Sequence, residues 1–486
     1  MNLILLFLLP SILAIVSLPW IKNHNVSNYW SALLASLSFL LAIPLIISSY
    51  TNPQPLFFLY HWLLCDKLSA FFIGLNSFIT LTTSFYSISY LNNEPPSLFH
   101  NLVYRFYHTF FHLFTFSMFL VILSNNIAFM WMAMELSTLT SVILVALYQT
   151  HEALEAAWKY LILCGTGIGL ALLGTVMIYF TAHPYLPNDQ SLLWTSLVTQ
   201  APLFSTKLLA IAFVFLFIGY GTKVGFFPLH NWLPDAHAEG PAPISALLSG
   251  LLLNVALLAI LRFKLILSHT SIASFACYLL LLFGVVSLLF SAFSLLRQHQ
   301  LKRLFAYSSI EHMSLISIAL GIGTPLAYLA GFLHILMHSL GKTAAFFSSG
   351  SIIQRFHTQN INQLKGLSAL IPWNTWGLLL SSFAILGLPP SGLFLSELFL
   401  IFAILKTSIW WLILPVIFGL ILSFIAIFSK IQRIAFSAHP IDYQPLTDTH
   451  HLLWPVFLHL SLILFAGFWI PLFFIQPVIH WLTQGL

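Results

Sequence analysis

Apolar segments about as long as the hydrocarbon layer of a membrane recur along the whole chain. A membrane-crossing helix needs about 20 apolar residues, and on this basis the sequence predicts about fourteen of them. Only 6% of the 486 residues are charged, against about 25% in a typical soluble domain. The chain is therefore predicted to be an all-α polytopic membrane protein. The predicted spans lie near residues 3–20, 30–48, 68–91, 107–124, 126–148, 153–181, 208–229, 241–262, 271–296, 303–322, 326–353, 371–399, 409–429 and 453–475.

Composition and motifs exclude several classes of protein. The formal net charge of +5 is scattered, without the basic run that nucleic-acid binding needs. Cys65, Cys164 and Cys277 lie far apart and form no CxxC pair, so neither an iron–sulfur cluster nor a disulfide framework is expected. We therefore expect no cofactor. Asn2–Leu18 lacks a charged leading segment and a cleavage site and is interpreted as the first span.

One predicted span, residues 208–229, contains a lysine and runs into a sequence that a continuous helix cannot accommodate. Lys223 lies inside the apolar stretch, and Pro228 and Pro234 interrupt the segment that follows, Phe226–His237. A charge at bilayer depth costs roughly 2.5–3.5 kcal/mol on insertion scales, so such residues usually face protein or water and mark ion paths. A broken helix beside them places backbone dipoles in the bilayer. The combination indicates cation transport, with the proton as the first candidate.

Two further ionisable residues in predicted spans are candidates for the same path. Glu135 is the expected partner of Lys223, because a buried carboxylate beside a lysine can stay ionised, and moving it would switch the lysine between proton uptake and release. A static ion pair between two helices is the alternative. Lys159 lies about one turn into its span. It is a second partner for Glu135, a link to the next lysine, or a side chain that reaches the interface.

His334, His338 and Lys342 follow one another at a spacing of four residues and so share one stripe of a helix. Two imidazoles and a lysine on one stripe favour a proton relay. Neutral histidines that bond across helices are the alternative. An HxxxH pair can also bind zinc, but no carboxylate or further ligand accompanies it in the sequence, so no metal site is predicted.

A second break is predicted at Pro389 and Pro390, a few residues before Glu397. Glu397 is then either the terminal proton site or a glutamate at the membrane surface. His230 and His237 flank the first break and are relay members or caps for freed backbone groups. Two interrupted helices at corresponding places in two halves are typical of a repeat transporter whose site lies at the breaks.

The distribution of Lys and Arg predicts the orientation. Loops after odd-numbered spans carry more of them than loops after even-numbered spans, which places both termini on the outer face. As a loop residue, Lys264 is expected to be dispensable. After odd-numbered spans lie Lys22, Arg105, Arg297, Lys302, Arg303, Arg355, Lys365, Lys430 and Arg433, and after even-numbered spans lie Lys67, Lys207, Arg262, Lys264 and Lys406.

Several of these segments together resemble a known family, the antiporter-like proton-conducting membrane subunits. It includes NADH-quinone oxidoreductase subunits L, M and N and the A and D components of multisubunit Na⁺/H⁺ antiporters. Within it, residues 219–225 and 249–254 look most like component F of hydrogenase-4. The resemblance covers about residues 110–400 and rests on Trp131…Glu135-Leu136, Ala157-Trp158-Lys159-Tyr160, Lys223 with Trp232-Leu233-Pro234-Asp235-Ala236-His237, Leu301-Lys302-Arg303-Leu304, His334…His338…Lys342 and Gly387…Pro389-Pro390…Ser396-Glu397.

The resemblance implies an architecture for the chain. It implies fourteen helices that contain two inverted five-helix repeats, with the seventh and twelfth helices broken. The expected divisions are residues 1–106 for helices 1–3, 107–262 for the first repeat, 271–429 for the second repeat and 430–486 for a loop and the last helix.

The resemblance also implies roles for individual residues. Glu135 and Lys223 match the coupling pair of the family, and Lys159 matches its nearby helper lysine. Connecting histidines match His334 and His338, and Glu397 matches the terminal residue on the twelfth helix.

One position departs from the family pattern. Where M-type members have a central lysine in the eighth helix, this chain has Asn254, and Ser249 stands where L-type members have histidine. Asn254 can bond water but cannot hold a proton at neutral pH. The path is then either incomplete at this point or continues through Lys342 and the histidines.

By resemblance, the expected function is that of a proton-translocating subunit of a hydrogenase-4 or complex I-like oxidoreductase complex in a bacterial inner membrane. Its expected partners are other membrane subunits and a peripheral redox arm, and it would hold no catalytic centre of its own. The alternative is a component of a multisubunit Na⁺/H⁺ antiporter, of the D type. A third interpretation is a scaffold that has lost conduction, for which Asn254 is the argument.

Overall fold

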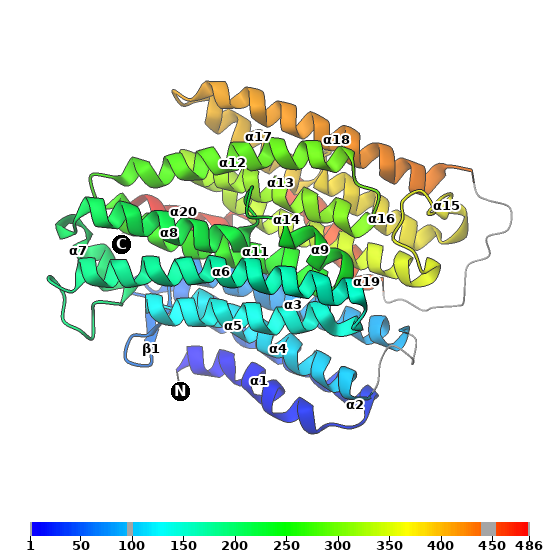
Figure 1. Cartoon of the computed structure of the whole chain (residues 1–486), viewed down its shortest axis with the longest axis horizontal. Coiled ribbons are helices and arrows are strands. Elements are labelled where there is room, and N and C mark those ends of the chain that lie inside the picture. The colour runs from blue at the N-terminus through cyan, green and yellow to red at the C-terminus, as the bar shows by residue number, and fades with distance from the viewer. Residues whose placement is uncertain (1, 95–100, 439–452, 485–486) are drawn as a thin grey trace.

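The computed structural model describes residues 2–94, 101–438 and 453–484, and its helices lie side by side along one long axis (Figure 1). The first half contains α1 (Leu3–Ser17), η1 (Leu18–Trp20), α2 (His24–Thr51), α3 (Lys67–Asn92), α4 (Asn101–Leu123), α5 (Ile127–Val145), η2 (Ala146–Tyr148), α6 (His151–Ala182), α7 (Trp194–Gln200), η3 (Ala201–Leu203), α8 (Thr206–Val224) and α9 (Trp232–Glu239). The second half contains α10 (Ala242–Leu247), η4 (Leu248–Leu252), α11 (Leu253–Ser268), α12 (Ala273–Leu296), α13 (Leu301–Ile322), α14 (Pro325–Phe356), α15 (Leu367–Leu370), α16 (Pro372–Ile385), α17 (Gly392–Leu405), η5 (Trp410–Leu412), α18 (Ile413–Phe436), α19 (Trp454–Phe468) and α20 (Leu472–Gln484).

The prediction of a helical protein with many membrane spans is confirmed. Within the described residues, 11 helices are long and apolar enough to cross a membrane, or up to 12 if α19 and α20 form one bent span. The predicted count of about fourteen is larger because two predicted spans are not among these helices. One is α14, which has 32 residues but is polar for its length. The other consists of α16 and α17, which have only 14 residues each. The count of fourteen stays a prediction.

One connecting region and the last predicted span differ from the structure that the sequence predicts. An antiparallel pair of short strands, β1 (Leu56–Phe58) and β2 (Leu63–Cys65), precedes α3. The predicted last span is two helices, α19 and α20, that meet at an angle of 67°. Both ends of the chain lie at the left end of the bundle in Figure 1.

Three basic residues that were expected in loops are buried, so this part of the loop assignment is wrong. α11 continues to Ser268 and takes Arg262 and Lys264 into the helix, where they are 2% and 6% exposed. Lys302 lies in the first turn of α13 and is 3% exposed. Burial is tolerated because each side chain meets polar atoms on other segments, as described below.

The interior of the bundle is formed by a continuous span, residues 242–268, together with α14. The most apolar stretch of this span is wholly buried, whereas the corresponding stretches of α6, α12 and α18 are 33–39% buried. α14 packs against α3, α10, α13, α16, α17 and α19. The outer helices therefore carry the apolar surface that suits lipid, and the inner helices carry the ionisable groups.

The first break lies between α8 and α9. α8 ends at Val224, and Gly225 follows with a φ of +85°, which favours glycine. A Cβ atom at this position would also lie 2.8 Å from the Leu233 side chain. The Phe227–Pro228 peptide is cis, and helical structure resumes at Trp232.

The second break lies between α16 and α17. Gly387 has a φ of +60°, the Pro389–Pro390 peptide is cis, and α17 begins at Gly392. Ser391 caps this helix, because its side chain accepts a bond from the Phe394 amide. The break places Glu397 in the second turn of α17.

Candidate functional site

The Lys223 ammonium is fully buried in the last turn of α8 and contacts a tyrosine. It donates a hydrogen bond of 3.1 Å to the Tyr160 hydroxyl on α6. That hydroxyl also bonds to the Ser141 hydroxyl on α5, at 2.7 Å. The Tyr160 ring stacks on Trp232, which begins α9, with ring centroids 4.4 Å apart. Lys223 is therefore held by a neutral hydrogen-bond chain that joins three helices and the first break.

Glu135 lies near this group without touching the lysine. Its carboxylate is partly buried on α5 and accepts a long bond of 3.4 Å from Thr138. Within the described part of the chain, no ion pair of 4 Å or less joins Glu135 and Lys223, although the carboxylate is close enough for its charge to act on the ammonium. Coupling between the two residues stays a prediction, with Tyr160 as the direct partner of Lys223.

Lys159 lies at the surface of the chain and, among the described residues, makes no ion pair with Glu135. About half of its side chain is exposed, and its ammonium pairs with Glu155 at 2.6 Å and with Asp235 at 3.1 Å. Asp235 also pairs with Arg303 at 2.6 Å. Lys159 thus links α6 to α9 and, through Asp235, to α13, while its role in transport stays a prediction.

The two histidines at the first break are buried among aromatic rings. The His230 ring lies 4.6 Å from Phe290 and is 2% exposed. The His237 ring stacks on Phe346 with centroids 4.9 Å apart, and neither of its nitrogens has a hydrogen-bond partner among the described residues. The positive charges of Lys302 and Lys342 both act on His237, so both lysines lie near it.

A polar cavity of about 390 Å³ lies beside the C-terminal end of α9. Its lining includes Glu94, Tyr148, Glu239, Lys302 and Gln354. The Lys302 ammonium donates to the Gly240 carbonyl at 2.8 Å, and the Glu94 carboxylate accepts bonds from Tyr148 and Gln354 at 2.8 and 2.7 Å. The cavity brings together polar groups that follow α3 or lie in η2, α9, α13 and α14, and one of them is Lys302, whose charge acts on His237.

Hydroxyl and amide groups occupy the middle of the central span. Its five-residue π-helical turn, η4, contains Ser249, whose hydroxyl bonds to Ser309 on α13 at 2.6 Å. The Asn254 amide donates to the Gly250 carbonyl at 2.9 Å and to the Ser339 hydroxyl at 2.8 Å. A π turn widens the helix and often marks a functional site. Here the turn contains Ser249 and ends two residues before Asn254, the two positions where members of the family have a protonatable residue.

Lys342 is fully buried on α14 and donates to the Phe305 carbonyl on α13 at 3.1 Å. Glu311, also on α13, is 3% exposed and close enough to act electrostatically on Lys342. No ion pair of 4 Å or less joins them in the described residues. Lys342 therefore resembles Lys223, with a neutral oxygen as its contact and a carboxylate nearby.

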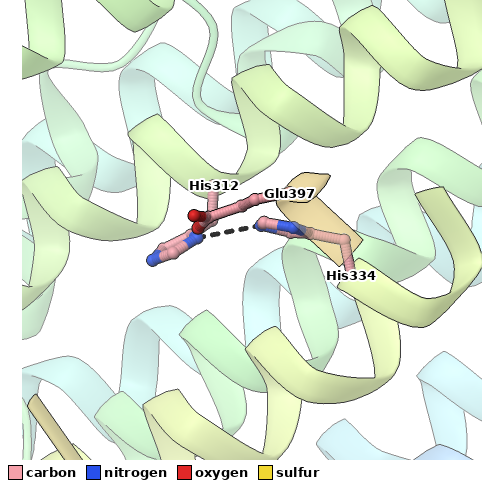
Figure 2. Close-up of side chains that lie close together, drawn as sticks. All are labelled: His312, His334 and Glu397. Atoms are coloured by element: carbon pink, nitrogen blue, oxygen red, sulfur yellow. Dashed lines mark hydrogen bonds between the residues drawn. The ribbon is translucent and has the colours of Figure 1, made fainter. Parts of the chain in front are cut away.

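His334 of α14 meets a histidine of α13, as Figure 2 shows. His312 Nδ1 on α13 lies 2.9 Å from His334 Nε2. His334 Nδ1 in turn bonds to the Ser396 hydroxyl on α17 at 2.9 Å. The His338 ring lies 5.3 Å from the His312 ring. His312, which the sequence did not single out, thus joins the two predicted histidines across helices.

Glu397 completes this group at the second break. A ligand oxygen of Glu397 and one ring nitrogen each of His312 and His334 all lie within 4.8 Å of one another. Its carboxylate packs against Gly387 so closely that a Cβ atom there would lie 2.2 Å from Glu397 Oε2. The glycine is needed for its positive φ and for this approach.

A buried ion pair lies outside this row of residues. The Arg262 guanidinium donates to both carboxylate oxygens of Asp66, at 3.0 Å for one of the two bonds, and to the Ser69 hydroxyl at 2.9 Å. The indole of Trp194 donates to the Arg262 carbonyl at 2.8 Å, and its ring lies 4.3 Å from the guanidinium. This arrangement joins α3, α7 and α11 and is structural in character.

The sequence and fold of the chain match known membrane proteins. Residues 124–425 match the family described as NADH:quinone oxidoreductase/Mrp antiporter, TM. A hydrogenase-4 component F homolog of Methylacidiphilum infernorum (isolate V4) is 44% identical over 478 residues, which is 96% of each chain. The chain belongs to the NADH:quinone oxidoreductase/Mrp antiporter transmembrane family. The predicted family, including its resemblance to hydrogenase-4 component F, is confirmed.

Two solved structures of complexes share the fold of this family member. A chain of the membrane-bound sulfane sulfur reductase, an archaeal respiratory membrane complex, aligns with a TM-score of 0.87 and 23% identity over 99% of this chain and 98% of that chain. A chain of the Mrp complex from Dietzia sp. DQ12-45-1b aligns with a TM-score of 0.85 and 16% identity over 98% and 96%. At these identities the likeness shows the fold alone.

Two functional candidates in this family member became visible only in three dimensions. Tyr160 directly follows Lys159, and nothing in the segment Trp158-Lys159-Tyr160 indicates that the Tyr160 hydroxyl faces Lys223. His312 likewise directly follows another ionisable residue, Glu311, and nothing in the sequence indicates that it contacts the histidines of α14. A buried polar side chain in a predicted span was the available signal for both.

Replacing Tyr160 by Phe is expected to slow proton transport about tenfold or more. The change removes the oxygen that accepts a hydrogen bond from the buried Lys223 ammonium. A hydrogen bond to a charged group contributes about 1.5–3 kcal/mol. Each 1.36 kcal/mol corresponds to a factor of ten in rate. Proton uptake by vesicles containing the assembled complex measures the effect. Tyr179→Phe on the same helix is the control, and equal rates for the two variants would contradict the role of Tyr160.

Proposed function

We propose that the chain is a proton-translocating membrane subunit of an energy-converting oxidoreductase complex of the hydrogenase-4 or complex I type. One observation carries the proposal: buried ionisable side chains lie along the inner helices, from Lys223 through Lys342 and the histidines to Glu397. Chains of such groups inside a membrane are typical of proton relays. The 44% identity to a hydrogenase-4 component F homolog along nearly the whole chain supports this type of complex.

In the proposed path, a proton enters from the polar cavity, passes His237 and the first break, and reaches Lys342. The charge of Lys342 acts on His237 and on the histidine cluster. Lys223 on α8, modulated by Glu135 on α5, binds and releases a proton at the first break. His334, His338 and Glu397 carry the proton from Lys342 to its exit. Ser249 and Asn254 line the central span with groups that bond water without holding a proton, so Lys342 takes the place of the missing central lysine.

The proposed membrane architecture has fourteen crossings. The helices group into residues 1–106, a first repeat at 107–262, a second repeat at 271–429, and the remainder at 430–486. The two breaks, after α8 and after α16, fall at corresponding places in the two repeats and support this division. Both chain ends lie at one end of the bundle in Figure 1, as an even number of crossings requires.

The proposed location is the inner membrane of a bacterium, with both termini on the outer face. The bias of Lys and Arg toward loops after odd-numbered spans supports this orientation. Burial removes Arg262 and Lys264 from the loops after even-numbered spans and Lys302 from those after odd-numbered spans, and the excess after odd-numbered spans remains. The proposed partners are further membrane subunits and a peripheral redox arm, since the chain itself is expected to hold no redox centre.

A second candidate is a component of a sodium/proton antiporter that works without electron transfer. The likeness to a chain of the Dietzia Mrp complex favours it, although at 16% identity that likeness concerns the fold. In this case Na⁺ rather than an electron donor would drive proton movement.

One experiment separates the two functions. The tagged chain is purified with its partners and reconstituted in vesicles, and proton uptake is measured with a reductant and without sodium, and then with a sodium gradient and without reductant. We expect uptake in the first condition alone. Uptake driven by sodium alone would support the antiporter, and absence of uptake in both would support a scaffold.

A further inference from the structure

A compact group of nitrogen and oxygen ligands lies where α13, α14 and α17 meet (Figure 2). It consists of His312, His334 and Glu397, whose exposed fractions are 1%, 2% and 9%. One ligand atom from each side chain lies within 4.8 Å of the others. In the sequence, no carboxylate accompanies the HxxxH pair of α14. In the fold, α17 supplies the carboxylate of Glu397 and α13 supplies a further histidine, His312.

Several polar atoms of this group lack a hydrogen-bond partner within the described residues. They are His312 Nε2, Glu397 Oε1 and both ring nitrogens of the adjacent His338. A buried polar atom without a partner costs about 1–3 kcal/mol. A cation in the group would bond the Glu397 carboxylate, so binding would remove the part of this cost that Glu397 Oε1 carries.

The ligand types define the class of cation. Imidazole nitrogens suit zinc and other divalent transition metals, whereas sites for harder cations are built from oxygen ligands. His312 Nδ1 and His334 Nε2 are 2.9 Å apart, close to the ~3.3 Å between two ligands at zinc–nitrogen distances of about 2.0–2.1 Å in a tetrahedral site. Two histidines and one glutamate also form a known zinc ligand set.

Nearby charges bear on whether a divalent cation is tolerated. Glu397 contributes one negative charge, and Glu311, next to His312 in the sequence, is close enough to act on Glu397. Lys342 acts on the histidines and opposes a cation. Because two carboxylates and one lysine lie near the site, the nearby side chains attract a cation more than they repel it.

We propose that His312, His334 and Glu397 form a binding site for a divalent transition-metal cation such as Zn²⁺. On binding, the proton between the two histidines moves to the other nitrogen of the ring that carries it, so that both rings bind the cation as neutral imidazoles. The further consequence rests on the proposed function: since His334 and Glu397 belong to the proposed proton path, the bound cation inhibits proton transport. Binding itself does not depend on that function.

The test uses the whole complex, stripped of loosely bound metal with a chelator and equilibrated with zinc chloride. Bound zinc is counted per complex, and X-ray absorption reports its ligands. We expect the wild type to bind one more Zn²⁺ than His312→Gln, with nitrogen and oxygen ligands at about 2.0–2.1 Å, and an affinity at least tenfold lower in the variant. Glu397→Gln serves as the second variant if His312→Gln fails to assemble.

His459→Gln is the matched control. His459 is also fully buried and bonds to Thr82 and to the Leu340 carbonyl, but it is not part of the cluster. The control should keep the wild-type zinc content. Equal zinc binding by wild type and both cluster variants, or a zinc spectrum without imidazole, would overturn the site. Zinc binding without inhibition of proton uptake would leave the site intact and remove His334 and Glu397 from the proton path.

Discussion

Replacing Lys223 by Met is expected to reduce proton translocation by the assembled complex about a hundredfold or more. Methionine keeps a long side chain in the fully buried position but removes the group that binds and releases the proton. The loss of one positioned proton-transfer group typically costs 10²–10⁴-fold. The Tyr160 hydroxyl would keep its bond to Ser141, so assembly of the complex should persist. Proton uptake by vesicles, normalised to the amount of complex, measures the effect.

Lys207→Met provides the matched control for this variant. Lys207 lies on the same helix, α8, and is exposed near its first turn. Its replacement should leave transport unchanged. Lys264, which the sequence suggested as a dispensable loop residue, is unsuitable as a control because it is 6% exposed and donates to the Tyr328 hydroxyl at 2.9 Å. Normal transport by Lys223→Met would exclude the central role of Lys223.

Replacing Arg262 by Met is expected to destabilise the protein by about 3–5 kcal/mol, because it leaves the Asp66 carboxylate buried and unpaired. The carboxylate and the guanidinium are 3% and 2% exposed, so water cannot replace the lost partner. Thermal unfolding of the purified complex and the amount of this chain in the membrane should both decrease.

A double variant separates loss of charge pairing from loss of packing. Asp66 caps α3 by accepting from the Ser69 amide at 2.7 Å, and Asn at this position retains the cap. Asp66→Asn combined with Arg262→Met should therefore recover much of the stability lost in the single variant. Equal instability of the single and double variants would mean that packing of the arginine, rather than its charge, stabilises this region.

The breaks and the depth of Lys223 could be read from the sequence because both depend on local chemistry. A proline lacks the amide hydrogen that a helix needs, and a glycine adopts a positive φ at low cost. Gly225 and Pro228 act in this way after α8, and Gly387 and Pro389 do so after α16. The length of an apolar run, in turn, fixes whether a charge within it lies at membrane depth.

The partners of the buried charges could not be read in the same way. Lys223 was expected to pair with Glu135, whereas its contact is the Tyr160 hydroxyl. For Lys159 the sequence left open a partnership with Glu135, a link to the next lysine or a position at the interface, and in the structure it pairs with Glu155 and Asp235. A helix that is apolar on nearly all sides has no pattern to fix which face turns inward.

The sequence by itself determined that this chain crosses a membrane many times, where two helices break, and which family it belongs to, because these properties rest on local runs and ordered motifs. The tertiary structure decided which side chains meet. It joined Arg262 to Asp66, 196 residues apart, and it brought His312 and Glu397 to the histidines of α14. Such contacts depend on how each helix is rotated against its neighbours, and packing of the whole bundle sets that rotation.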